Sequence, residues 1–396
     1  IGAGQAERSA AVPKPVVVTV APTSGEAAEM IEAALGRAQD ARRRGQRLIV
    51  ALAPGRFRLR RPIEIGAAHG GTWRAPTVLR GAGAGRTTLI GSAPAPAFDG
   101  DWSELRRRLP AEARKHVRAF KLPAGLARVK SIGIKRFHAT PAGPVPFEVF
   151  DTVGAMTPAR WPNTGWAAVG SGASGSEGSG QAAEIGVDAP RIAAWRNEPD
   201  LWLLGYLRYD WSFEQLRVGS VDATGQRLIL ADRPYYGVKP GDRVFVAHAL
   251  AELDAPGEWY YDHRRGVLLA WPRGKSDQVE VSVAASAIRM VGAGHVRISE
   301  LGIARVRGDA VVITGGQDVV VERSAIRWAG GRAVVVRGAR ASGVTASLLE
   351  ELGEGGVVLE GGDRASLRGG NLFVGDSRIE RFARLGRTYK PAIRLA

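Results

Sequence analysis

The sequence predicts an all-β fold, namely a right-handed parallel β-helix with an N-terminal capping helix and an inserted antiparallel β domain. Three features predict it: a repeated strand pattern near the C-terminus, one amphipathic helical segment near the N-terminus, and an aromatic-rich stretch between them that breaks the repeat. Glycine contributes 52 of the 396 residues, which is typical of a chain with many turns. At this length an elongated repeat or two to three domains is expected rather than one compact core.

The N-terminal quarter is expected to hold a tail, a capping helix and the first coils. We interpret residues 1–22 as the tail and residues 23–96 as the helix with the first coils. A helix over 23–45 is predicted because apolar side chains recur with helical spacing at Ala27, Met30, Ile31, Ala34, Leu35 and Ala38. Short β runs follow at 47–53, 56–59, 77–80 and 87–90.

Residues 97–277 interrupt this rhythm. Aromatic side chains are concentrated between positions 200 and 272 in hairpin-like patterns, among them Trp202, Tyr206, Trp211 and Phe245. We therefore expect residues 97–277 to form an inserted, antiparallel β-rich domain.

A repeat begins after residue 277. Four segments share one plan and start at residues 300, 324, 347 and 377, so that successive starts are 24, 23 and 30 residues apart. A second apolar strand follows in each coil, at 309–313, 332–336, 356–359 and 391–395. A fixed period in this range, with many β-branched residues and no helical spacing, favours a β-solenoid over residues 278–396.

Two of these coils contain extra residues, near 361–370 and near 383–390. In a β-solenoid the strands form the scaffold, and the long turns carry binding and catalytic residues. The two lengthened turns are therefore the expected location of a functional groove.

Composition excludes several classes of function. The chain has no cysteine, which excludes disulfides, thiolate metal sites and a cysteine nucleophile. The six histidines lack metal-ligand spacing, so no metal site and no cofactor is expected, although acidic turns of a β-helix can hold calcium. No apolar run is long enough to span a bilayer, and no nucleic-acid-binding motif is found, so neither a membrane nor a nucleic acid is expected as a partner.

The net charge of +16 favours contact with polyanions, including acidic glycans. The basic residues are dispersed along the chain, and an arginine-rich solvated surface explains the same charge.

Candidate site residues lie mainly in the two lengthened turns. Asp363, in Gly361-Gly-Asp-Arg364, is the candidate catalytic acid, although Gly-Gly-Asp is also ordinary turn chemistry. Arg387, Tyr389 and Lys390 could bind an acidic sugar or supply the base of a lyase, and packing of Tyr389 on the neighbouring coil is the alternative. Trp161 is a candidate platform for a sugar ring, although a tryptophan beside a proline is often a packed corner.

Several longer motifs resemble those of a known group. Ala159-Arg-Trp-Pro-Asn163, the stretch 251–262 followed by 266–272, Gly361-Gly-Asp-Arg364 and the stretch 388–393 resemble motifs of bacterial right-handed parallel β-helix proteins related to glycoside hydrolase family 141. The resemblance covers roughly residue 30 to the end, by pattern. It implies a secreted or periplasmic carbohydrate-active protein with a polysaccharide or oligosaccharide as its partner. Arg364, Arg387, Tyr389, Lys390 and Trp161 are then the expected substrate-binding residues around Asp363.

The sequence departs from this group at its end. In the relatives, several more coils with acidic and histidine-rich segments follow the strand that here ends near Ala396. We therefore expect a fragment or one part of a nicked protein, whose β-helix is completed by a second polypeptide that could also supply the main catalytic acids.

Three functions follow from these features. The first is a glycoside hydrolase that cleaves a polysaccharide with paired carboxylates in a β-helix groove. The second is a polysaccharide lyase for an acidic glycan, which the positive charge favours. The third is a solenoid that binds glycans without catalysis.

Overall fold

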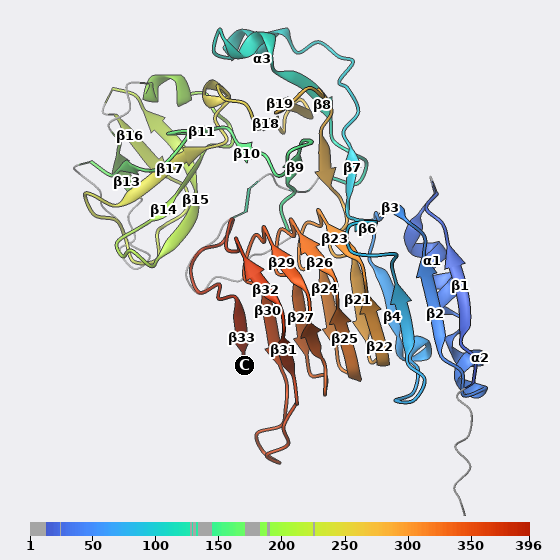
Figure 1. Cartoon of the computed structure of the whole chain (residues 1–396). Helices are drawn as coiled ribbons and strands as arrows, with labels where there is room; N and C mark the ends of the chain where they lie inside the picture. Colours follow the sequence, from blue (N-terminus) through green and yellow to red (C-terminus); the bar gives the residue numbers. More distant parts are fainter. Residues whose placement is uncertain are drawn as a thin grey trace, which may run out of the picture.

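The computed structural model describes residues 13–23, 25–126, 129, 132–133, 145–170, 183–187, 191–224 and 226–396. These residues form a stack of β-coils and a mostly antiparallel region that projects from one side of it (Figure 1). Each complete coil contributes one strand to each of three parallel sheets, so the chain advances along the stack by one strand per sheet and per coil.

The three parallel sheets are the walls of the stack. The first comprises β1 (Val16–Val20), β2 (Leu48–Leu52), β5 (Thr77–Arg80), β22 (Gly294–Ser299), β25 (Gln317–Glu322), β28 (Gly343–Thr345) and β31 (Phe373–Gly375). The second comprises β3 (Gly55–Arg58), β6 (Thr87–Ile90), β23 (Gly302–Ala304), β26 (Ala325–Arg327), β29 (Leu348–Glu350) and β32 (Arg378–Glu380). The third comprises β4 (Ile63–Gly66), β21 (Ile288–Val291), β24 (Val311–Thr314), β27 (Val334–Arg337), β30 (Val357–Glu360) and β33 (Ile393–Leu395).

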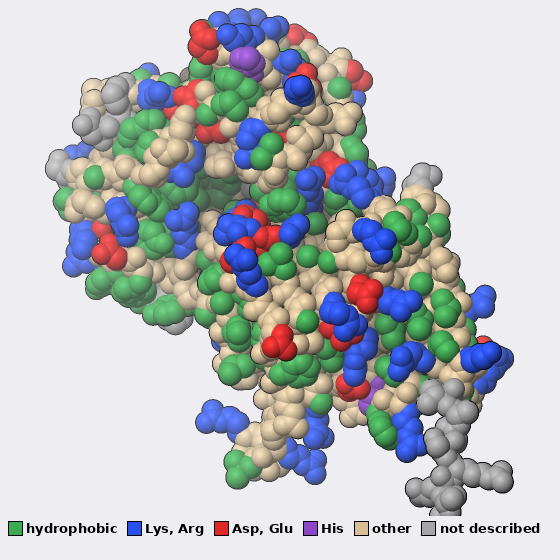
Figure 2. Space-filling model, viewed as in Figure 1, with side chains coloured by type: hydrophobic (Ala, Val, Ile, Leu, Met, Phe, Trp, Pro, Cys, Tyr) green, Lys and Arg blue, Asp and Glu red, His purple; other side chains and the backbone are tan. Residues whose placement is uncertain are grey.

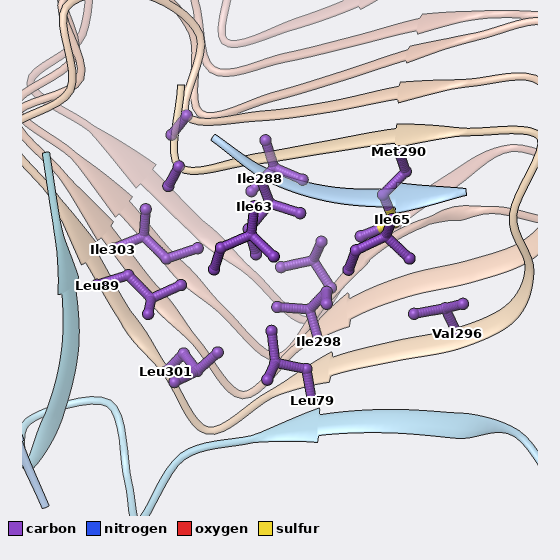
Figure 3. Packing of buried hydrophobic residues seen from close by; sticks show 14 of the residues in the cluster. Ile63, Ile65, Leu79, Leu89, Ile288, Met290, Val296, Ile298, Leu301 and Ile303 are labelled. Atoms are coloured by element: carbon purple, nitrogen blue, oxygen red, sulfur yellow. The ribbon is translucent and has the colours of Figure 1, made fainter. Parts of the chain in front are cut away.

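The core of the stack consists of rows of apolar side chains that lie above one another in successive coils. Ile288 pairs in register with Val311, which pairs with Val334, and each of these side chains is fully buried. Figure 3 shows Ile63 with Ile288, and Leu89 with Ile303, packed in this way inside the coils. Burial of such rows on every coil is the main force that holds a solenoid together. The predicted parallel β-helix class is therefore confirmed.

The serines that recur in the repeat have a structural role. Ser324 Oγ accepts a hydrogen bond from the backbone N–H of Leu301, and Ser347 Oγ accepts one from Ser324. Each hydroxyl also donates to the carbonyl two residues earlier in its own coil, at 2.8 Å in both cases. These bonds satisfy buried backbone groups at the bend between the first and second sheets.

The N-terminal end of the stack differs from the predicted arrangement in two ways. Val16–Val20, within the segment interpreted as a tail, is strand β1 and pairs in parallel with β2. The helix predicted over 23–45 is two short helices, α1 (Ala27–Leu35) and α2 (Ala38–Arg43), because the helix is interrupted at Gly36 and Arg37. Glycine in a helix interior is unfavourable by about 1 kcal/mol, which explains a break at this place.

The region between β6 and β21 replaces one coil turn with a large insertion, which we call the inserted region (residues 91–287). Its neck is a three-stranded antiparallel sheet of β7 (Ser92–Pro94), β20 (Glu280–Ser282) and β9 (Val149–Phe150). The sequence analysis placed β7 and β20 in the coil segments. Their short runs of mixed polarity do not distinguish a coil strand from a neck strand.

Two further sheets complete the inserted region. The middle sheet comprises β8 (Arg118–Lys121), β10 (Thr157–Pro158), β18 (Glu258–Asp262) and β19 (Val267–Trp271). The outer sheet is antiparallel and comprises β11 (Arg160–Trp161), β12 (Ala167–Ala168), β13 (Glu184–Gly186), β14 (Trp202–Tyr206), β15 (Phe213–Asp222), β16 (Arg227–Leu230) and β17 (Arg243–Ala247). Helix α3 (Ser103–Arg108) packs near the short 3₁₀ turn Leu250–Glu252; other such turns are Ala67–His69, Ala113–Lys115 and Ile192–Trp195.

No helix among the described residues is long and apolar enough to cross a membrane.

Candidate functional site between the coil turns and the inserted region

One row of coil turns faces the inserted region. In every coil this turn joins a strand of the second sheet to a strand of the third sheet, at 305–310, 328–333, 351–356 and 381–392. The inserted region grows out of the same turn one coil earlier, between β6 and β21. Insertion and turns are therefore neighbours, and Figure 2 shows the surface hollowed between them, with hydrophobic side chains in the hollow.

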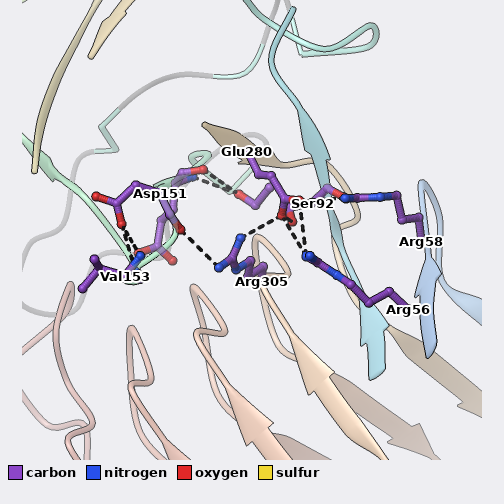
Figure 4. Close-up of polar contacts among 10 residues, drawn as sticks. Arg56, Arg58, Ser92, Asp151, Val153, Glu280 and Arg305 are labelled. Atoms are coloured by element: carbon purple, nitrogen blue, oxygen red, sulfur yellow. Dashed lines mark hydrogen bonds and ion pairs between the residues drawn. The ribbon is translucent and has the colours of Figure 1, made fainter. Parts of the chain in front are cut away.

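Glu280 anchors the neck of the inserted region to the coils (Figure 4). Its carboxylate is 2.7 Å from Arg58 of β3 and 2.8 Å from Arg305 of the first facing turn, and it accepts a hydrogen bond from Ser92. Burial opposes ionisation of Glu280, but the bond from Ser92 and the guanidinium groups outweigh it and lower its pKa to about 2. This ionised group fixes the neck on the stack.

The long last turn, residues 381–392, is attached to the outer sheet of the inserted region. Thr388 Oγ1 accepts a hydrogen bond from the Phe213 N–H and donates one to the Trp211 carbonyl, both at 2.7 Å. Gln215 donates to the carbonyl of Leu385. The turn therefore bridges the coil stack and the outer sheet, and it forms one wall of the hollow.

Two glutamates lie against consecutive residues of one facing turn, Gly330 and Gly331. Glu148, from the neck, is 7% exposed and lies over Gly330, where a side-chain Cβ would be 3.3 Å from Glu148 Oε2. Glu354, from the turn of the next coil, donates its backbone N–H to the carbonyl of Gly331. We call Glu148 and Glu354 the carboxylate pair.

The long turn supplies a cation to each member of the carboxylate pair. Arg384 lies 2.9 Å from Glu148, and Lys390 lies 3.0 Å from Glu354. Arg332 of the preceding turn also contacts Glu354, at 3.3 Å. Both carboxylates are therefore held in place by cations of the coil turns.

An arginine–aromatic cluster forms the wall of the outer sheet that faces the long turn. Its members are Trp166, Tyr206, Phe213, Phe245, Arg160, Arg243 and Arg387. The rings contact one another, with centroids 5.5 Å apart for both Trp166–Tyr206 and Trp166–Phe245. The Arg160 guanidinium lies 3.8 Å from the Phe245 centroid, and the Arg387 guanidinium lies 5.3 Å from that of Trp166. Guanidinium groups over aromatic faces are attracted by the ring quadrupole.

This cluster is positively charged. Burial, and then the like charge of Arg387, lower the pKa of Arg160, against the opposing charge of Glu258. Burial also raises the pKa of Glu258 to about 7, although backbone N–H groups of Asp254 and Ala255 favour its ionised form. Glu258 therefore offsets only part of the charge of Arg160 near neutral pH. Among the described residues, no carboxylate lies within ion-pair distance of Arg160 or Arg387.

The structure brings some of the predicted site residues together and separates others. Arg387, Tyr389 and Lys390 lie on the long turn at the hollow, where Tyr389 is 70% exposed and contacts Trp211. Asp363 and Arg364 lie on an exposed hairpin after β30 that projects away from the inserted region (Figure 1). Asp363 accepts hydrogen bonds from Ser366 and Ala365, which lower its pKa. This is turn chemistry at a site remote from the hollow.

Trp161 packs inside the inserted region. Its ring is half-buried, lies 5.6 Å from the ring of Trp195 and belongs to the apolar core of the outer sheet. Its neighbour Arg160 reaches Phe245 on the opposite face, since successive strand residues point to opposite sides. Of these two adjacent residues in the motif at 159–163, it is therefore Arg160 that faces the hollow.

Sequence reasoning missed Glu148, Arg160, Arg243 and the role of Glu354. Strand alternation around Trp161 is a signal that could have identified Arg160. Glu148 and Glu354 lie against consecutive residues, Gly330 and Gly331, although they are more than two hundred positions apart, and no local sequence pattern indicates this.

The described residues include no group of three or more histidine and acidic side chains arranged to hold a metal ion.

Comparisons with known proteins support the fold. No protein-family model matches the sequence, and no curated protein matches it. A solved structure described as "Glycoside hydrolase" has a TM-score of 0.66 and 14% identity, over 88% of this chain and 68% of that one. Weaker matches are "The complex structure of XylC with xylose" (TM-score 0.46, 10% identity, 88% and 51% of the two chains) and the tailspike protein of Pseudomonas phage LKA1 (0.16, 11%, 82% and 37%). The first match shows that this chain shares the fold of that protein.

Proposed function

We propose that this chain is a carbohydrate-active protein, a glycoside hydrolase that binds its glycan in the hollow between the coil turns and the inserted region. The carboxylate pair carries the proposal, because Glu148 of the neck and Glu354 of a coil turn lie against consecutive residues, Gly330 and Gly331. Hydrolysis of a glycosidic bond generally requires two such carboxyl groups, one on each side of the scissile bond.

Three further observations support the proposal. The fold is shared with a protein described as a glycoside hydrolase. Tyr389 and the rings of the arginine–aromatic cluster offer apolar faces beside the carboxylates. Two of the motifs that resemble family 141 lie along this site, since Arg160 belongs to the first motif and Tyr389 to the last.

In this proposal Glu148 and Glu354 divide the roles of general acid and of base or nucleophile. The cations of Arg384 and Lys390 position them, and Arg387 and Tyr389 contact the sugar. Asp363, placed outside the hollow, is not needed for this chemistry. We expect such an enzyme to act outside the cytoplasm, where polysaccharides are found.

The test is release of reducing ends from a panel of plant, algal and microbial polysaccharides by the full chain. Glu148→Gln and Glu354→Gln are each expected to lower turnover about a hundredfold or more, because each removes a group that transfers a proton or attacks the sugar. Glu64→Gln, at an exposed ion pair on β4, is the matched control.

Activity that survives in both Gln variants and disappears in Asp363→Asn would identify Asp363 as the catalytic acid. That result would overturn the assignment of the carboxylate pair. Retained activity in all of these variants would show that the catalytic acids are supplied elsewhere, for example by a second polypeptide.

A second candidate function is a lyase for an acidic glycan. The arginine–aromatic cluster favours it, since a lyase must neutralise the carboxylate of its substrate before a base removes the neighbouring proton. Tyr389 and Lys390, beside this cluster, are then the candidate bases. The ultraviolet absorbance of an unsaturated uronate product distinguishes elimination from hydrolysis.

A further inference from the structure

We propose that the arginine–aromatic cluster binds the anionic substituent of an acidic sugar, a carboxylate or a sulfate ester, between the guanidinium groups of Arg160 and Arg387. This inference rests on the proposed function, because it assigns the substrate class of the same hollow.

The first support is a pair of positive charges that no ion pair neutralises. Arg160 and Arg387 lie over two rings in contact, those of Phe245 and Trp166, and neither arginine forms an ion pair with a described carboxylate. Other arginines of these coil turns pair with carboxylates, as do Arg332 with Glu354 and Arg384 with Glu148, while Arg307 donates to backbone carbonyls. Two like charges held together without a counter-charge are stabilised by an anion placed between them.

The second support is the fixed position of Arg160. Its Nε donates to the Pro162 carbonyl at 2.8 Å, and its Nη2 donates to the Gly165 carbonyl at 2.6 Å. A guanidinium has five N–H donors, so these two bonds orient the group and leave others for a ligand. Because Arg160 is held before any ligand arrives, binding loses little side-chain entropy.

The third support is the apolar surround. Arg387 lies over Trp166 and Phe213, with distances of 5.3 and 5.4 Å from its Cζ to the ring centroids. Arg243 lies 4.9 Å from Tyr206 on the same wall and pairs with the exposed carboxylate of Asp210 at 3.5 Å. The rings cover one side of the guanidinium groups, which strengthens their attraction for an anion, and they offer flat faces to a sugar ring.

The net positive charge of the whole chain also favours binding of an acidic glycan. A net charge of +16 raises the local concentration of a polyanionic glycan and speeds its encounter with the hollow. Both effects weaken as salt is added, so binding of an acidic glycan is expected to fall with ionic strength.

The test is isothermal titration of the full chain with three probes: an oligogalacturonate, a sulfated galacto-oligosaccharide and a neutral xylo-oligosaccharide. We expect tighter binding of an acidic probe, and the carboxylate and sulfate arms identify which anion is preferred. Arg160→Gln and Arg387→Gln should each weaken that binding about tenfold or more, since a charge-assisted hydrogen bond is lost. Arg37→Gln, which removes the same charge from an exposed position outside the hollow, should not.

Arg387 is exposed, so its variant keeps the test valid if Arg160→Gln fails to fold. The inference is overturned if wild type binds acidic and neutral probes alike, or if both variants bind the acidic probe as tightly as Arg37→Gln. Cleavage of a neutral glycan with unchanged rates in both variants would reject the inference and leave the proposed function standing. Binding of the acidic probe that depends on these arginines, without turnover of any glycan, would support the inference and reject the proposed function.

Discussion

Glu280 is the residue on which attachment of the inserted region depends most. Three arginines from two coils surround its carboxylate, and the side chain of Arg305 is only 12% exposed. Glu280→Gln leaves Arg305 partly buried without its partner, so we expect the free energy of unfolding to fall by about 3 kcal/mol. Urea denaturation at neutral pH measures this loss.

The matched control is Glu64→Gln, whose exposed ion pair with Arg289 should contribute no more than about 1 kcal/mol. The pKa of Glu280 is lowered from 4.5 to about 2, so its contribution to the free energy of unfolding is complete above pH 4.5. This contribution should disappear as the pH falls from 4.5 to about 2. Equal losses in the two variants would contradict the anchoring role.

Glu258 should show the opposite pH dependence. Its pKa is raised from 4.5 to about 7 by burial, so the folded chain holds this proton more tightly than the unfolded chain does. Its stabilising effect is therefore complete below about pH 4.5 and is lost as pH rises toward 7, by up to about 3 kcal/mol.

Unfolding of wild type and Glu258→Gln, compared from about pH 5 to about pH 8, tests this expectation. Gln cannot titrate, so the stability of wild type relative to the variant should decline over this range. Glu112→Gln, at an exposed position, should show no such trend. A constant difference between wild type and Glu258→Gln would show that Glu258 titrates as an ordinary carboxyl.

At the scale of elements, the long turn 381–392 depends on the outer sheet for its conformation. Thr388→Val removes a hydrogen bond that its hydroxyl accepts and one that it donates. We expect faster amide exchange in residues 384–390 and weaker glycan binding, with little change in global stability, because the strands of the stack are untouched.

Thr314→Val, at an exposed strand position on β24, is the matched control and should leave exchange in the turn unchanged. Unaltered exchange in Thr388→Val would mean that the turn is held by the coils alone.

The sequence predicted strands best where the repeat is regular. The rows through Ile288, Val311 and Val334 follow directly from alternating apolar residues at a fixed period. Strand β1 was missed although Val16–Val20 is rich in β-branched residues, because it stands before the first repeat and pairs only as an edge. The break at Gly36 was missed because the apolar spacing continues across it.

At the scale of the whole molecule, the sequence predicted an insertion but not where its surfaces meet the coils. The insertion packs against the row of facing turns so that Glu148 lies over Gly330, and this contact depends on three-dimensional packing alone. The hairpin carrying Asp363 and the turn carrying Arg387 were treated as one groove, although they arise from opposite bends of their coils. The lengthened turns therefore indicated one wall of the hollow, and did not indicate the carboxylate pair of the proposed function.

The last coil has an apolar outer edge. Ile393 is 44% exposed, Leu395 74% and Phe373 37%, and all three lie on the final strands of their sheets. Exposed strand edges of this kind favour pairing with further β structure.

The central claim is that the glycan binds between the coil turns and the inserted region. Hydrogen–deuterium exchange of the full chain, with and without a bound oligosaccharide from the panel, tests this claim directly. If the glycan binds in the hollow, bound oligosaccharide should give new protection at residues 160–166 and 384–390, on its two walls, with no change at 361–370. Protection confined to the hairpin 361–370 would contradict it.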